Sequence, residues 1–121
     1  FNPSRIMKTK EIYLCGVKVM IAYCFATEIA FKKFTGANLD EFDASNPEHI
    51  IYIILAAIAS YYQAEGKDAP VKDEGLLYHA KPKEMIDALN EVLKLRAEWY
   101  ELPKGEKEPE KTDEPGEEKN A

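Results

Sequence analysis

The residues of this 121-residue chain that could act in catalysis or bind a metal ion are two histidines and two cysteines. His49 follows Glu48 and His79 follows Tyr78, and a histidine beside a carboxylate can transfer protons near neutral pH. The sequence has no nucleophile elbow, no glycine-rich phosphate loop and no helical pair of histidines with zinc-ligand spacing. We therefore expect both histidines to be structural residues at loop–helix junctions, and we do not expect an enzyme.

Eight residues separate the two cysteines, Cys15 and Cys24. This spacing matches neither a redox pair nor the usual ligand spacing of a zinc site. A reducing cytosol keeps such thiols free, and a free cysteine commonly behaves as a small buried hydrophobe. We expect two structural thiols, with no metal and no cofactor.

Charge and hydropathy exclude two further classes of function. The net charge is −6, from 22 acidic and 16 basic residues, whereas binding to a phosphate backbone needs clustered Lys and Arg. The longest apolar run covers residues 50–59, about half of the roughly 20 residues that span a bilayer. The first residues lack the apolar core of a signal peptide. The sequence predicts a cytoplasmic protein that binds neither nucleic acid nor membrane.

The first element that must position these residues is a β-hairpin over about residues 10–23. Large apolar residues alternate with smaller or polar ones on both sides of Cys15-Gly16, and glycine allows the tight reversal between two strands. Two strands are only marginally stable alone. The hairpin must therefore pack on helices or pair through its edge with another chain.

Three main helices follow, predicted at residues 24–35, 47–65 and 82–101. Gly36 and Gly66 are typical of residues that end a helix, and a proline opens each of the second and third helices. Apolar residues cover most of the second helix, so either other elements wrap it or its excess face is an interface. The third has one apolar stripe opposite a charged face.

On the first helix, the apolar residues fall into two neighbouring groups. Phe25 and Ile29 share one face, and Phe34 lies on the adjacent one with Ala30. Lys32 and Lys33 are expected to remain in solvent. The fold class that results is mainly α, within the α+β class.

The composition changes abruptly after Pro103. Residues 104–121 contain seven acids, four lysines and no aliphatic side chain larger than alanine, so they cannot form a core and are predicted to be disordered. Met7 begins an ordinary start-like segment, and we interpret residues 1–6 as an upstream or artificial extension. The expected organisation is a flexible extension at 1–9, a helical domain at 10–102 and an acidic tail at 103–121.

Large apolar residues of the hairpin and the helices are candidate contacts with a partner or a second copy. They are Ile12, Leu14, Ile51, Ile54, Ile58, Tyr61, Tyr62, Trp99 and Tyr100. Aromatic rings with a polar tip are favoured in protein interfaces, but the two aromatic pairs could equally close the end of the domain. Both interpretations stay open on the sequence alone.

Several short segments resemble the tail assembly chaperones of long-tailed phages and prophages. These segments are Leu14-Cys15-Gly16, residues 23–31, and Phe34-Thr35-Gly36 with the following Leu39 and Phe42. Residues 45–48, Ser-Asn-Pro-Glu, stand where family members often have a similar helix-opening turn. The resemblance covers about residues 10–102, and none of its motifs is catalytic.

The resemblance implies a specific role and specific partners. Members of the family coat the long helical tape measure protein before the tail tube polymerises around it, and a frameshifted longer form carries a domain that recruits tube subunits. It implies a self-associating chaperone in the bacterial cytoplasm that keeps the tape measure protein soluble, with the tail tube protein as a second partner. The alternative is a small adaptor or regulatory module that binds one partner without an assembly role.

Overall fold

The structure is a computed structural model that describes residues 7–101. Its elements are β1 (Thr9–Leu14), β2 (Val17–Ala22), α1 (Phe25–Thr35), the 3-10 helix η2 (Leu39–Glu41), α2 (Pro47–Glu65), α3 (Asp73–Tyr78) and α4 (Pro82–Tyr100). The predicted hairpin followed by three main helices is confirmed, and α3 is a short additional helix. The predicted tail at 103–121 and residues 1–6 of the extension predicted at 1–9 lie outside the described residues, and Thr9, the last residue of that extension, begins β1.

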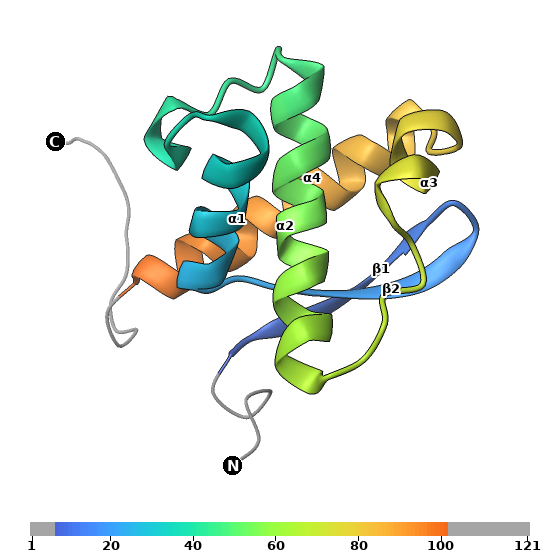
Figure 1. The fold of residues 1–121 in the computed structure, drawn as a ribbon, viewed down its shortest axis with the longest axis horizontal. Helices are drawn as coiled ribbons and strands as arrows, with labels where there is room; N and C mark the ends of the chain where they lie inside the picture. The colour runs from blue at the N-terminus through green and yellow to red at the C-terminus, as the bar shows by residue number, and fades with distance from the viewer. Residues whose placement is uncertain (1–6, 102–121) are drawn as a thin grey trace, which may run out of the picture.

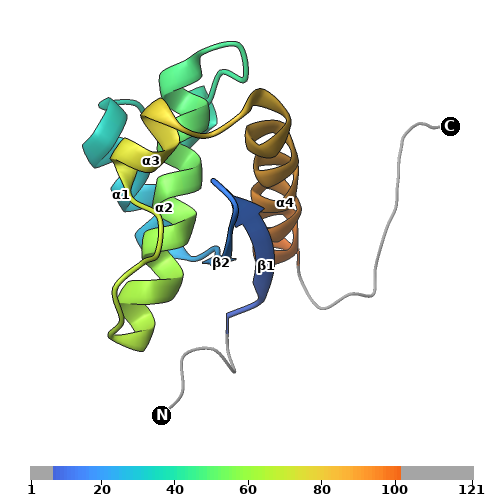
Figure 2. The same ribbon diagram turned by 90° about the vertical axis from the view of Figure 1, so that its right-hand side faces the viewer.

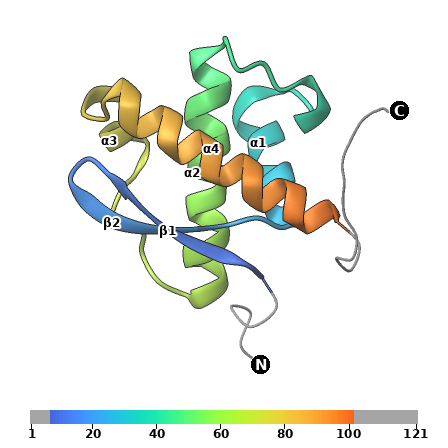
Figure 3. The ribbon, with the colours of Figure 1, turned by 180° about the vertical axis from the view of Figure 1, so that it is seen from behind.

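Helices α2 and α4 contact each other, and the hairpin packs against both of them (Figure 1). Figure 2 shows the hairpin between α4 on one side and α2, with α1 and α3, on the other. From behind, α4 crosses in front of α2, and the hairpin runs beside it (Figure 3). The contacts between elements agree with this arrangement: β2 packs on α2, β1 packs on α4, and α1 lies along α2. The two-stranded sheet is therefore stabilised by helices of its own chain.

The hairpin closes through the two-residue turn at Cys15-Gly16. Both residues have positive φ, 54° and 80°, as a type I′ turn requires because its twist matches that of the flanking strands. The register places Ile12 opposite Val19, and both side chains are buried together with Leu14 and Ile21 of the same face. The buried face turns toward the helices, while Tyr13 on the other face is 61% exposed. This alternation is the one that the sequence predicts.

The middle of α2 is wrapped by other elements. Asn46 caps the helix, its Oδ1 accepting from the Glu48 backbone N–H at 2.9 Å, and Gly66 ends it with a φ of 70°. The six residues Ile53–Ile58 are all buried. Of the two alternatives for its excess apolar surface, wrapping by the domain itself accounts for this central part.

Four of the predicted contact residues lie in the core instead. Ile12 is 7% exposed, Leu14 and Ile54 are 0% exposed, and Ile58 is 1% exposed. All four belong to the cluster of buried residues that joins the hairpin to α2 and α4. The sequence assigns these four residues to a contact surface because periodicity shows only that a face is covered. It does not show whether the same chain or another one covers that face.

Candidate binding surface

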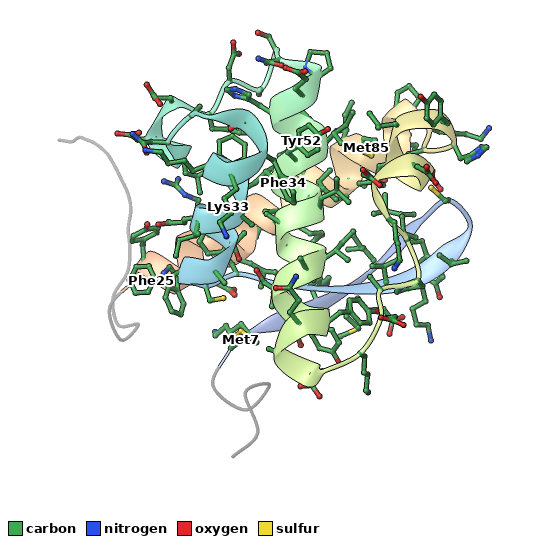
Figure 4. All side chains as sticks on the ribbon, viewed as in Figure 1. Met7, Phe25, Lys33, Phe34, Tyr52 and Met85 are labelled. Atoms are coloured by element: carbon green, nitrogen blue, oxygen red, sulfur yellow. The ribbon has the colours of Figure 1, made fainter. Side chains whose placement is uncertain are left out.

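The outer side of α1 carries an uncovered apolar surface. Phe25, Ile29 and Phe34 are 65%, 59% and 49% exposed. Figure 4 shows Phe25 and Phe34 at the two ends of this helix. The ring of Phe25 meets Trp99 edge-on at 5.4 Å, and that of Phe34 lies 5.2 Å from Tyr52, between ring centroids. We call Phe25, Ile29 and Phe34 the α1 patch; exposed apolar groups of this kind commonly mark binding sites.

A chain of hydroxyl groups holds α1 in this orientation. The Cys24 backbone N–H donates to Thr27 Oγ1 at 3.0 Å, and Ser60 Oγ donates to the Ala56 carbonyl at 2.8 Å. The two hydroxyl oxygens lie 2.5 Å apart. Either hydroxyl can donate to the other, since each also has a second acceptor, Cys24 Sγ for Thr27 and the Ala56 carbonyl for Ser60. Thr27 and Phe31 are the buried residues of α1 and form its inner face, whereas Phe25 and Ile29 are exposed.

A hollow of about 290 Å³ separates α1 from α2 beside this patch. Its lining consists of Ala26, Ile29, Ala30, Lys33, Phe34, Ala56, Ala59, Ser60 and Gln63. A second hollow of about 520 Å³ lies on the other side of α2, toward the segment that leads to α3. The two share Lys33, Phe34, Ala59 and Gln63, so they form one depression across the outer face of α2.

A tyrosine–glutamate cluster joins the start of α1 to the end of α4. The hydroxyl of Tyr23 donates to Glu28 Oε2 at 2.9 Å, and the hydroxyl of Tyr100 donates to the same oxygen. The guanidinium of Arg96 lies 5.3 Å from the centroid of the Tyr100 ring. Sequence reasoning missed this cluster because Glu28 and Tyr100 are brought together only by the packing of α4 on the rest of the domain.

Burial, together with the carboxylate of Glu28, raises the pKa of Tyr23 far above its ordinary value. The unfolded chain therefore releases this proton at a lower pH than the folded chain does. Above about pH 10 the unfolded state binds fewer protons, so the free energy of unfolding falls as the pH rises. We expect denaturant melts between about pH 9 and 11 to show this loss, and Tyr23→Phe to make it less steep.

The matched control for this prediction is Tyr78→Phe, which removes the hydroxyl of a ring that is 77% exposed. A Tyr23→Phe variant that loses stability with pH as steeply as the unchanged protein would contradict the prediction.

The remaining predicted contact residues have mixed positions. Ile51, Tyr61, Tyr62 and Trp99 are partly buried, whereas Tyr100 is 53% exposed. The hydroxyl of Tyr62 accepts the Met20 backbone N–H at 3.1 Å, which ties α2 to the outer edge of β2. Trp99 covers one side of Phe25. Tyr62 therefore has a structural contact, while Trp99 and Tyr100 flank the α1 patch and the adjacent cluster.

His49 and Cys15 are held in structural contacts, whereas His79 is exposed at the end of α3. His49 Nδ1 accepts the Asp43 backbone N–H at 3.0 Å, and its ring lies against Phe31 and Phe42. Cys15 Sγ donates to the Gly75 carbonyl at 3.3 Å, and burial raises the pKa of this thiol. Both cysteines are free. Within residues 7–101, no group of His, Cys, Asp and Glu is arranged to hold a metal ion.

Comparisons with known proteins add no family assignment. No family model, curated protein or solved structure matches the chain. In the part of the chain that the structure describes, no helix is both long and apolar enough to cross a membrane.

Proposed function

We propose that this chain is a tail assembly chaperone, which binds the tape measure protein and keeps it soluble until the tail tube polymerises around it. The observation that carries the proposal is the α1 patch, three large apolar side chains left exposed by the domain's own core. The resemblance of residues 10–102 to the tail assembly chaperones supplies the identity of the client.

The size of the patch suits a contact that must later be released. Burying a large apolar side chain completely is worth about 1.5–3 kcal/mol, so covering three half-exposed ones gives roughly 1 kcal/mol each. One such contact is too weak for a permanent complex. Many copies bound along one long client would hold it in solution together, and each copy could be displaced singly by the polymerising tube.

The test is coexpression of the full chain with a tape measure protein. We expect the unchanged chain to bring most of the client into the soluble fraction. The double substitution Phe25→Ser and Ile29→Ser should return the client to the insoluble fraction, because it removes most of the apolar area of the patch. A client that stays insoluble with the unchanged chain would overturn the proposal.

The matched control is Leu77→Ser with Tyr78→Ser. These residues of α3 are also exposed, 46% and 77%, but neither lines the depression across α2. Circular dichroism should show native helix content in both double variants. Equal loss of client solubility in the two would show that general surface hydrophobicity, and not the α1 patch, is responsible.

Self-association is part of the same proposal. Size-exclusion chromatography with light scattering should give a mass above that of one chain, 13.7 kDa. A strict monomer would favour the alternative, an adaptor that binds one partner without assembly.

A further inference from the structure

We propose that the hollow between α1 and α2 receives an amphipathic helix of the partner, with an acidic residue beside its apolar stripe, and that Lys33 pairs with that acid. The inference rests on the proposed binding role of the α1 patch and adds the shape and charge of the segment that is bound.

The walls of the hollow favour a helix over an extended segment. Both walls are helices, whose backbone N–H and C=O groups are bonded within each helix. An extended segment placed there would bury backbone groups without partners, whereas a helix satisfies its own. Four alanines in the lining, Ala26, Ala30, Ala56 and Ala59, leave room for a close approach.

The length of the surface sets the length of the bound segment. α1 has 11 residues and is therefore about 16 Å long, which matches about three turns of a partner helix. Three turns present apolar side chains at positions i, i+3 or i+4, and i+7 on one stripe. Such a stripe can cover Ile29 and Phe34, which both line the hollow.

The charge of the surface selects the partner's flanking residue. Lys33 is the one charged residue among those that line the α1–α2 hollow. It also lines the hollow beyond α2 and a third one, of about 650 Å³, beside Arg96 and Tyr100. Figure 4 shows it on α1 beside Phe34. Among residues 7–101 it makes no ion pair within 4.0 Å.

The carboxylates of Glu28 and Asp40 are not placed to pair with Lys33 in this hollow. Glu28 accepts from the hydroxyls of Tyr23 and Tyr100, and it lines the third hollow together with Asp40. Neither acid lines the hollow between α1 and α2. Asp68 and Asp73 line only the hollow beyond α2. Within the hollow between α1 and α2, a carboxylate brought in by the partner would therefore meet Lys33 and no other charged residue, and a partner lysine at the same place would be repelled.

The experiment uses two synthetic amphipathic helical peptides of three to four turns, identical except for one residue beside the apolar stripe, which is Glu in one and Lys in the other. Binding to the full chain is measured by fluorescence anisotropy at low salt. We expect the Glu peptide to bind about tenfold more tightly than the Lys peptide. In Lys33→Glu the preference should reverse.

Lys32→Glu is the matched control, because it makes the same charge change at the next residue of α1. Lys32 donates to Asn38 Oδ1 at 3.1 Å and lines only the third hollow, so this substitution should leave the Glu preference in place. Equal affinity for the two peptides, absence of binding to either, or an equal effect of Lys32→Glu and Lys33→Glu would each overturn the inference.

These outcomes are separable from those of the coexpression test, since the peptides are not the tape measure protein. A Glu preference with an insoluble client would reject the chaperone proposal and leave the helix-binding inference standing. A soluble client together with equal binding of the two peptides would reject the helix-binding inference and leave the chaperone proposal standing.

Discussion

Replacing Phe31 by alanine should lower the free energy of unfolding by about 3–5 kcal/mol, whereas the same replacement at Phe25 should lower it by about 1 kcal/mol or less. Both residues belong to α1, but Phe31 is 0% exposed and Phe25 is 65% exposed. Alanine at 31 leaves a cavity beside the rings of Phe42 and His49. Alanine at 25 loses mainly the edge contact with Trp99.

Urea unfolding followed by circular dichroism measures both values, and an unchanged dependence on urea concentration would show that the unfolded states are comparable. The comparison also bears on function, because the two substitutions remove the same atoms. If Phe25→Ala destabilised the domain as much as Phe31→Ala, then Phe25 would belong to the core, and the α1 patch would no longer be a surface that awaits a partner.

Thr27→Val and Ser60→Ala should each lower the free energy of unfolding by about 1–3 kcal/mol. Both hydroxyl groups are buried, and each substitution leaves a neighbour without its partner. Valine at 27 removes the acceptor of the Cys24 N–H, and alanine at 60 removes the hydroxyl group that pairs with that of Thr27. Either substitution alone already interrupts the hydrogen bonds that link Thr27 to Ser60. The double variant should therefore lose less unfolding free energy than the two single variants lose in sum.

A double-mutant cycle measures this difference, which should exceed the ~0.5 kcal/mol within which independent sites add. Thr35→Val is the control on the same helix: its hydroxyl donates to the Phe31 carbonyl at 2.8 Å but is only partly buried, so water can replace it. Additive losses at 27 and 60 would show that the two hydroxyl groups act independently and do not fix the orientation of α1.

The helices and strands themselves were predictable because their signals are local. The pair Cys15-Gly16, the prolines at 47 and 82 and the glycines at 36 and 66 act on their own backbone, whatever surrounds them. The predicted limits of α2 match the structure, and those of α1 and α4 differ from it by one residue. The predicted hairpin likewise differs by only one residue at each end.

Which faces are covered was decided only by the tertiary structure. The sequence showed that Phe25 and Ile29 share a face, but that face is exposed, while Ile12 and Leu14 of the predicted contact set lie in the core. Periodicity fixes the direction of a side chain relative to its own helix or strand. Which direction becomes the interior depends on contacts between distant residues, such as the hydroxyl pair of Thr27 and Ser60 on the face of α1 that also buries Phe31.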